Sequence, residues 1–391
     1  MKHKLADRID KIQPSFTLQM ATIAAELRAK GESVINFSVG EPDFNTPENI
    51  IDAGKKAMDQ GYTKYTAGPG MIEFRQAICK KLKLENGLEY SIDEILVSNG
   101  EKQSLSTACQ ALFGQGDEVI VFQPYWVSFP EFIRLADAEP LLINTLPEKN
   151  FEPDFEELLS KDLKAVKGVI LNSPSNPTGG VWGEEALIRM LKIAKKHNWI
   201  VISDECYERL VYDGEFTSTE KINQDHNINA TVITCLSLSK TYSMTGWRIG
   251  YSAGPAYIIK AMAKIQGQAT SCANSIGQFA GIEALTGSQD SVNNMILEFE
   301  QRRNFLVKEL SLIRNVDCKK PGGAFYVFPK LKKNNLSSFE ISQYLLEKKY
   351  IATVPGSSFG SNGEGFLRIS YASSKENLEK FVECLKDFMN E

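Results

Sequence analysis

Apolar and polar positions follow one pattern from about residue 94 to residue 255. Short runs that are apolar throughout alternate there with stretches of helical periodicity, and such runs are typical of strands covered on both faces of a sheet. Residues 184–197 carry Leu187, Met190 and Leu191 on one stripe, which predicts an amphipathic helix. The alternation predicts an α/β fold, with a mostly parallel sheet covered by helices. The predicted strands are 95–97, 119–122, 168–171, 200–202, 232–233 and 249–251.

After about residue 288 the pattern changes to a mixture of helices and strands. A long charged helix is predicted at 292–313, a strand at 324–328, a helix at 338–348 and a strand at 366–370. The last helix carries Leu378, Phe381, Val382, Leu385 and Phe388 on one face. We therefore expect a large domain at 46–288, a smaller α+β domain at 289–391, and an N-terminal arm at 1–45 that packs on the smaller domain.

The length and composition agree with a globular protein of two domains. At 391 residues the chain exceeds the size at which one hydrophobic core stops growing, and 42% of its residues are hydrophobic. The formal net charge of -5 provides no overall attraction to nucleic acid or to anionic lipid. Chemistry on small molecules is therefore the expected class of function.

The cysteines, the histidines and the N-terminal sequence bear on cellular compartment and on metal binding. The seven cysteines lie far apart and form no C-x-x-C pair, which favours a reducing environment over disulfides or a zinc cluster. With three histidines, a metal site is not expected. The N-terminus has no apolar signal region, and no apolar run of 18 residues occurs. We expect a cytoplasmic protein that does not enter a membrane.

Lys240 is the residue that suggests a chemistry. It follows a strand-like apolar run, and burial next to a core lowers a lysine pKa enough for the amine to act as a nucleophile, for example in a Schiff base. Ser237 and Arg248 lie near it in the sequence and can hold an anion. An amine beside an anion clamp suggests a phosphorylated carbonyl cofactor. A surface lysine in a flexible loop is the alternative.

Two further strand ends carry polar groups. Gly100 and Glu101 open a helical run after residues 95–98, so free backbone N–H groups there can bind a phosphate, although an ordinary helix start gives the same pattern. Asp204 ends another apolar strand, where α/β sheets bind ligands. Its carboxylate could keep a pyridine nitrogen protonated, or it could simply cap a helix.

Three more residues are candidates for binding. Asn176 lies between two prolines after a buried strand, and its amide could contact a phenolate oxygen. Trp126 ends a strand and could stack on a planar ring, although core packing is commoner for tryptophan. Arg368 lies in an apolar strand, where a carboxylate from a ligand or from a structural ion pair would compensate its charge.

Taken together, these motifs resemble those of the pyridoxal-phosphate-dependent aminotransferases of fold type I, class I/II. The similarity extends over nearly the whole chain, and the chain resembles the bacterial aspartate aminotransferases in this family. It rests on Asn176-Pro177-Thr178-Gly179, Asp204 with Tyr207, Ser237-x-Ser239-Lys240, Gly246-Trp247-Arg248-x-Gly250, residues 39–44, 65–70 and 321–326, and Arg368-Ile369-Ser370.

The resemblance implies roles around pyridoxal 5'-phosphate. Lys240 would carry the internal aldimine and then move the proton between Cα and the cofactor. Asp204 would pair with the pyridinium nitrogen, Tyr207 and Asn176 would contact the phenolic oxygen, and Trp126 would stack on the ring.

The resemblance also implies a phosphate site and a dimer. Ser237, Arg248 and the N–H groups of Gly100 and Glu101 would bind the phosphate, and Tyr65 would come from a second subunit of a homodimer. Glu101 departs from the small residue usual at this position, so we expect its side chain to point away from the anion.

For the substrate, Arg368 would grip the α-carboxylate, with Gly40, Asn176 and Trp126 beside it. Lys102 would recognise the distal carboxylate of an acidic substrate, and no arginine occurs between Arg248 and Arg302 to do so instead.

The predicted function is transfer of the amino group of aspartate or glutamate to a 2-oxo acid such as 2-oxoglutarate, by ping-pong half-reactions. Prephenate or aromatic transamination and a carbon–sulfur β-lyase remain open, because cofactor-binding residues do not select the bond that breaks at Cα. A cofactor-sensing regulator is the alternative from another class. It would carry an N-terminal DNA-binding domain, for which the 38 residues before Val39 leave too little chain.

Overall fold

A computed structural model describes residues 3–6, 8–12, 16–333 and 336–391. At its centre is an eight-stranded sheet in the order β2-β9-β8-β7-β6-β3-β4-β5. The strands from β8 to β4 in this order are parallel, β9 is antiparallel to both of its neighbours, and β5 is antiparallel to β4. These strands are β2 (Ile95–Ser98), β3 (Glu118–Gln123), β4 (Glu139–Leu146), β5 (Glu152–Pro153), β6 (Val166–Asn172), β7 (Ile200–Asp204), β8 (Thr231–Ser237) and β9 (Gly250–Ala253).

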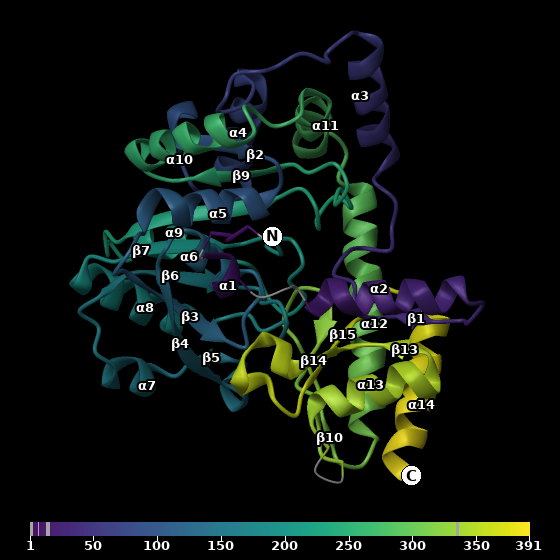
Figure 1. Ribbon diagram of the computed structural model, residues 1–391. Coiled ribbons are helices and arrows are strands. Elements are labelled where there is room, and N and C mark those ends of the chain that lie inside the picture. The colour runs from purple at the N-terminus through teal and green to yellow at the C-terminus, as the bar shows by residue number, and fades with distance from the viewer. Residues whose placement is uncertain (1–2, 7, 13–15, 334–335) are drawn as a thin grey trace.

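Helices cover both faces of this sheet (Figure 1). On β3, Val119 and Val121 face the helices α5, α6 and α10, whereas Ile120 and Phe122 face α7, α8 and α9. Both faces are apolar because both are buried, so the predicted α/β fold with a mostly parallel sheet is confirmed. The helices of this part are α3 (Glu48–Asp59), α4 (Ile72–Asn86), α5 (Glu101–Leu112), α6 (Phe129–Leu135), α7 (Phe155–Ser160), α8 (Glu184–His197), α9 (Thr219–Asp225), α10 (Ala256–Ala269) and α11 (Ser275–Thr286).

The strand β4 was not predicted from the sequence. It begins at Glu139 with a proline directly after it, and most of its residues are only partly buried. A proline near the start and an interrupted apolar run both weaken the strand signal. Parallel pairing with β3 over six residues, from Glu118 with Glu139 to Gln123 with Asn144, forms the strand nevertheless.

The C-terminal part of the chain, from α12 (Asp290–Ser311) onward, folds around a hydrophobic core of its own. A three-stranded antiparallel sheet, in the order β11-β15-β14, packs on helices through aromatic side chains such as Phe299, Phe325 and Phe381. The elements are α12 (Asp290–Ser311), β10 (Val316–Asp317), β11 (Tyr326–Val327), β12 (Lys330–Leu331), α13 (Ser338–Lys349), β13 (Ile351–Ala352), β14 (Val354–Pro355), β15 (Leu367–Ser370) and α14 (Lys375–Asn390). Short 3₁₀ helices lie at Ile92–Glu94, Pro147–Lys149, Gly356–Phe359 and Ser361–Gly363.

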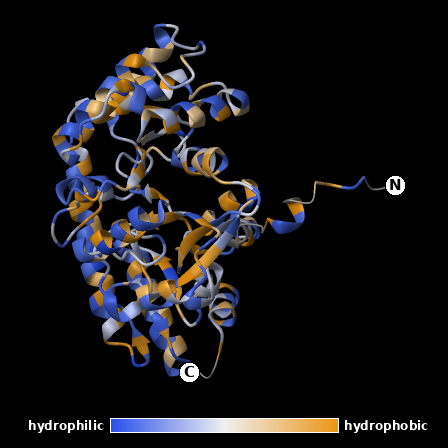
Figure 2. Ribbon diagram, turned by 90° about the vertical axis from the view of Figure 1, so that its left-hand side faces the viewer, coloured by the Kyte–Doolittle hydropathy of each residue, from blue (hydrophilic) through white to orange (hydrophobic). Residues whose placement is uncertain are grey.

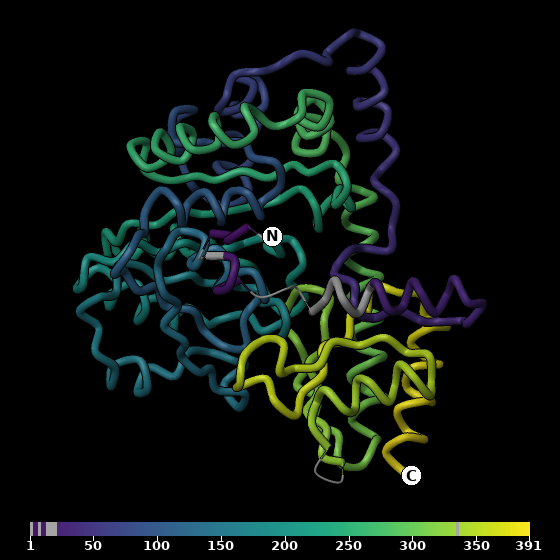
Figure 3. Tube along the Cα trace, viewed as in Figure 1, coloured from purple at the N-terminus to yellow at the C-terminus, as the bar shows by residue number. Residues whose placement is uncertain are grey.

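The N-terminal segment contains α1 (Arg8–Lys11), α2 (Phe16–Ala29) and β1 (Ile35–Asn36). Figure 3 shows the purple segment of α2 and β1 beside the yellow C-terminal part. Here Ile35 pairs with Ile351 and Asn36 with Ala352 in a parallel ladder, and Phe37 joins the C-terminal core. The exact domain limits stay a prediction.

The hydropathy of the ribbon follows the same layering. Figure 2 shows apolar strands inside and helices of mixed polarity around them. None of the helices in the described part of the chain is both long and apolar enough to cross a bilayer. The described residues also contain no cluster of three or more histidine, cysteine, aspartate or glutamate side chains that could hold a metal ion.

The sheet topology sets where a ligand can bind. Parallel neighbours end at the same edge, so the segments that follow β3, β6, β7 and β8 meet there. Asp204 is the last residue of β7, and Ser237 is the last residue of β8. The C-terminal part reaches the same edge through β15, which carries Arg368.

Candidate active site

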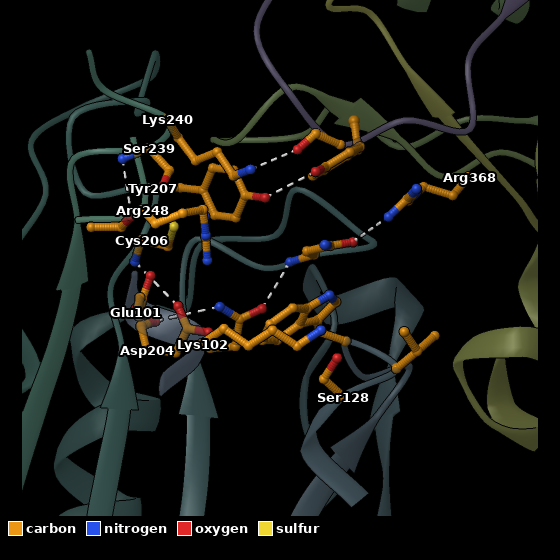
Figure 4. Close-up of a pocket in the computed structure, with 17 residues that line it drawn as sticks. Glu101, Lys102, Ser128, Asp204, Cys206, Tyr207, Ser239, Lys240, Arg248 and Arg368 are labelled. Carbon is orange, nitrogen blue, oxygen red and sulfur yellow. Dashed lines mark hydrogen bonds between the residues drawn. The ribbon is translucent and has the colours of Figure 1, made fainter. Parts of the chain in front are cut away.

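A cavity of about 260 Å³ lies at this edge, between the sheet and the C-terminal part (Figure 4). Most of the predicted site residues line it, although their positions span Gly40 to Arg368 in the sequence. They are Gly40, Glu101, Lys102, Trp126, Asn176, Asp204, Tyr207, Ser237, Lys240, Arg248 and Arg368. The fold therefore brings together residues that the sequence places far apart.

Lys240 projects its amine into the cavity (Figure 4). Its Nζ donates a 2.7 Å hydrogen bond to the carbonyl oxygen of Gly40. Burial lowers the pKa of Lys240 below its ordinary value, and the positive charge of Arg248 acts in the same direction. A lysine with a lowered pKa has more of the neutral amine that can attack a carbonyl carbon.

Asp204 and Glu101 place two carboxyl groups on the floor of the cavity (Figure 4). They are 4% and 5% exposed and lie within hydrogen-bonding reach of one another. Burial raises the pKa of Asp204 to about 6. Burial and then repulsion from Asp204 raise the pKa of Glu101 well above its ordinary value. The Glu101 side chain thus turns toward Asp204, a direction that no local pattern in the sequence indicates.

Arg248 packs against the start of α5. A Cβ atom at position 100 would collide with the Arg248 guanidinium, and Gly100 has a φ of +76° that favours glycine. Arg248 Nη1 also donates a 2.8 Å bond to the carbonyl of Thr245. The Oγ of Ser237 accepts a 3.0 Å bond from the backbone N–H of Ser239. A guanidinium, hydroxyls and a helix N-terminus therefore converge on one end of the cavity.

Two tyrosines line another part of the cavity. The hydroxyls of Tyr207 and Tyr326 are 2.9 Å apart, and both side chains are buried. Burial and then the Tyr326 hydroxyl raise the pKa of Tyr207 well above its ordinary value, so its O–H remains available as a donor. The Tyr326 hydroxyl also occupies the space that a Cβ at Gly40 would need.

Arg368 reaches the cavity from β15 and is 2% exposed. Its Nη1 donates a 2.9 Å bond to Asn176 Oδ1, and its Nη2 donates to the carbonyl of Ser38. Nothing in the described part of the chain accepts a bond from its buried Nε. The guanidinium also lies 4.7 Å from the centre of the Tyr326 ring. A buried cation without a carboxylate among these partners suits an anionic ligand.

Trp126 and Lys102 form another part of the wall. The Lys102 Nζ lies 5.2 Å from the centre of the Trp126 ring, close enough for a cation–π contact. The Trp126 ring packs edge to face on Phe129 and Phe132, with centroid distances of 5.5 and 5.8 Å. These contacts fix the indole plane beside the cavity.

Tyr65 lies outside the cavity of its own chain. Its side chain is 89% exposed, on the segment between α3 and α4. Among the other tyrosines, Tyr62 and Tyr257 are also exposed, at 44% and 70%. The role expected for Tyr65 therefore depends on a second subunit.

Several lining residues were not predicted as site residues. Tyr326 lies in a predicted strand, but its apolar neighbours gave no sign that its hydroxyl reaches a cavity. Asn172 gave no separate signal within its strand, and it accepts a 2.8 Å bond from the backbone N–H of Asn176. The unpredicted lining residues are Val127, Ser128, Asn172, Cys206, Ser239 and Tyr326.

Comparison with known proteins decides the family. The sequence model of the family "Aminotransferase class I and II" matches residues 32–385. The chain belongs to this family. The cavity at the edge of the sheet agrees with this family, because a lysine, a buried aspartate and a buried arginine line it together.

Individual members of the aminotransferase family resemble the chain over its full length. It is 42% identical to an aspartate aminotransferase of Bacillus sp. (strain YM-2), with 100% of each chain covered. It is also 42% identical to a probable aspartate/prephenate aminotransferase of Aquifex aeolicus, again with 100% of each chain covered. The solved structure of the Thermus thermophilus aspartate aminotransferase with maleate superposes with a TM-score of 0.93, at 38% identity, covering 99% of this chain and 100% of the other. The predicted family and fold are thus confirmed.

Proposed function

We propose that this aminotransferase binds pyridoxal 5'-phosphate and transfers the amino group of aspartate or glutamate to a 2-oxo acid such as 2-oxoglutarate. The observation that carries the proposal is the position of the Lys240 amine in a cavity that Asp204 and Arg368 also line. A nucleophilic amine, a buried carboxylate and a buried guanidinium are the groups that a cofactor aldehyde, a ring nitrogen and a substrate carboxylate require.

The residues present fit this cofactor. Gly100 leaves room for the Arg248 guanidinium at the start of α5, so N–H groups and a cation are available to a phosphate at one end. Asp204 is available to a ring nitrogen, and Trp126 offers a flat face to the ring. When bound, pyridoxal phosphate supplies an aldehyde that reacts with amines and a cationic ring that withdraws electrons from the substrate Cα.

Each residue has a defined task in this proposal. Lys240 would hold the cofactor covalently and, once released by the substrate amine, move a proton from the substrate Cα. Asp204 would keep the ring nitrogen protonated, and the Tyr207 and Asn176 side chains would donate to the phenolic oxygen. Arg368 would bind the α-carboxylate with two parallel N–H bonds, beside Gly40.

An acidic substrate is supported by the second cation of the cavity. The ammonium of Lys102 lies beside Trp126, so it could meet a distal carboxylate. The Thermus thermophilus relative was solved with maleate, a dicarboxylic acid. No arginine stands between Arg248 and Arg302 that a partner subunit could offer for this purpose.

Prephenate is the second candidate substrate. The Aquifex aeolicus relative is a probable aspartate/prephenate aminotransferase. Prephenate is a 2-oxo acid with a second carboxylate, so Arg368 and Lys102 could bind it in the same way. The Trp126 ring would then contact the cyclohexadiene.

A steady-state assay tests the function. The purified, cofactor-loaded protein should form oxaloacetate from aspartate and 2-oxoglutarate, and glutamate should accumulate in equal amount. Prephenate in place of 2-oxoglutarate tests the second candidate. Pyruvate release from cystathionine without oxaloacetate formation would instead show a carbon–sulfur β-lyase and contradict the proposal.

The proposed assembly is a homodimer in which Tyr65 reaches the partner's phosphate site. A mixed dimer of one Tyr65→Phe chain and one Lys240→Ala chain tests it. If Tyr65 acts across the interface, one of the two sites contains neither change, and about half of the wild-type activity returns. If Tyr65 acts within its own chain, both sites stay impaired. A monomer in sedimentation experiments would contradict the dimer itself.

The proposed location is the cytoplasm. All seven cysteines are free thiols in the structure, as a reducing compartment requires. Fractionation of the native host cells tests it, and recovery of the protein outside the cytoplasm would contradict it.

A further inference from the structure

Glu101 and Asp204 form a buried carboxyl pair at the base of the cavity (Figure 4). The two side chains come from different elements, since Glu101 is the first residue of α5 and Asp204 ends β7. Each is at most 5% exposed, and the two carboxyl groups lie within hydrogen-bonding reach. Two carboxylates this close in a buried place cannot both stay ionised, so one proton between them is the stable arrangement.

The hydrogen bonds decide which carboxyl carries the proton. Asp204 Oδ1 accepts a 3.2 Å bond from the backbone N–H of Cys206, and the Asn172 side chain donates a 3.4 Å bond to the backbone carbonyl of Asp204. Glu101 has only the Cys206 thiol as a neutral donor, and its Oε1 finds no partner in the described part of the chain. Donors stabilise the anion, so the proton belongs on Glu101.

The surrounding charges do not reverse this assignment. The positive charge of Lys240 favours ionised Glu101, but it contributes less than burial and less than repulsion from Asp204. The other titratable groups that face Glu101 are neutral or lie at the anion end of the cavity. They are Cys206 on the segment after β7, Cys235 on β8, Tyr251 on β9, and Arg248.

We propose that Glu101 is a positioning residue: as a neutral acid it donates a hydrogen bond to Asp204 and thereby keeps Asp204 ionised toward the cofactor ring nitrogen. This inference rests on the proposed function, because it assigns Asp204 to that nitrogen. Glu101 itself touches Asp204 and acts through it. The hydrogen bond opposes the effect of burial, which by itself raises the pKa of Asp204.

The first test measures cofactor affinity against pH on the apoprotein, by tryptophan fluorescence, without any turnover. Glu101→Gln keeps a neutral donor and should match the wild type within about threefold. Glu101→Leu removes the donor, so Asp204 takes up its proton at a higher pH. Affinity should then be about tenfold weaker at pH 6 and closer to the wild type at pH 8.

The outcomes separate this inference from the proposed function. No pyridoxal phosphate binding by the wild type would overturn the function. Binding with an unchanged pH profile in Glu101→Leu would overturn only the role of Glu101. If Glu101 is ionised, Glu101→Gln should tighten binding markedly, since it removes a negative charge beside Asp204, and that result too would overturn the inference.

Infrared spectroscopy provides a second measurement that needs no cofactor and no leucine variant. In the wild-type apoprotein at pH 8.5, a carbonyl stretching band of a protonated carboxylic acid should be present. It should be absent from Glu101→Gln and present in the surface variant Glu148→Gln. Identical spectra for the wild type and Glu101→Gln would contradict the proposal.

Discussion

Arg368 Nη1 donates a 2.9 Å hydrogen bond to Asn176 Oδ1 and so joins β15 of the C-terminal part to the segment after β6 of the large sheet. The same guanidinium donates to the carbonyl of Ser38, which precedes α3. Three distant parts of the chain therefore fix one cation at the cavity, and its Nε remains without a partner in the described residues.

Replacing Arg368 by lysine should impair every amino acid substrate. An ammonium keeps the charge but cannot make two parallel bonds to a carboxylate, so kcat/KM should fall at least about tenfold for aspartate, glutamate and alanine alike. The matched control is Arg314→Lys on the exposed surface, which should leave kcat/KM unchanged. A loss confined to the acidic substrates would show that Arg368 does not bind the shared α-carboxylate.

Lys102→Ala should change substrate selectivity. The variant loses a charge-assisted bond to a distal carboxylate, so KM for aspartate should rise about tenfold, whereas KM for alanine should stay within about twofold. Lys102→Arg keeps the charge and should recover part of the preference for aspartate. Equal increases for both substrates would contradict the proposed role in selectivity.

Gly100→Ala should weaken binding of the cofactor phosphate. The new Cβ would displace the Arg248 guanidinium, and the backbone angles of Gly100, φ +76° and ψ 158°, lie in a region that is almost confined to glycine, which adds about 1–3 kcal/mol of strain. Gly116→Ala is the matched control, because Gly116 also has a positive φ, of +89°, with no atom within 4 Å of the new Cβ. Both variants should lose stability, but only Gly100→Ala should lose cofactor affinity in an absorbance titration. Equal affinities would exclude Arg248 from the phosphate site.

Burial of the Glu205 carboxyl group should make the free energy of unfolding depend on pH. Its side chain is 1% exposed, and burial raises its pKa to about 7 although Ser203, Ser218 and the N–H of Thr219 donate to it. The folded protein then holds a proton that the unfolded chain releases near pH 4.3. The free energy of unfolding should therefore fall as the pH rises from about 4.3 to about 7, by about 3.7 kcal/mol in total from this group.

Urea unfolding of the apoprotein at pH 5 and pH 7.5 checks this contribution. Between the two pH values the free energy of unfolding of Glu205→Gln should fall by about 2.5 kcal/mol less than that of the wild type, because the other titrating groups are common to both proteins. Parallel pH dependences would show that Glu205 titrates normally in the folded state.

Much of the fold could be predicted, because buried helices and strands require apolar residues at regular positions in the sequence. The helix predicted at 184–197 is α8 with the same limits, because one apolar stripe and a terminal asparagine define it. The strand predicted at 200–202 extends to Asp204 as β7, because its polar last residues are also buried. The strand β4 was not predicted, because its proline and its half-buried residues interrupt the continuous apolar run that marks the other strands.

The site was predictable where a motif joins residue type to a strand end, as for Lys240 and Asp204. It was not predictable where a side chain enters the cavity by tertiary packing alone. Tyr326 reaches Tyr207 across 119 residues of sequence. The direction of the Glu101 side chain depends on how α5 meets β7, which no local pattern encodes.

The lysine that holds the cofactor can be identified directly by chemical trapping. The protein loaded with pyridoxal phosphate is reduced with borohydride, digested, and analysed by peptide mass spectrometry. We expect one modified residue, Lys240, whose amine faces the cavity and has a lowered pKa. Cofactor attached to another lysine, or recovered entirely free of the chain, would contradict this expectation.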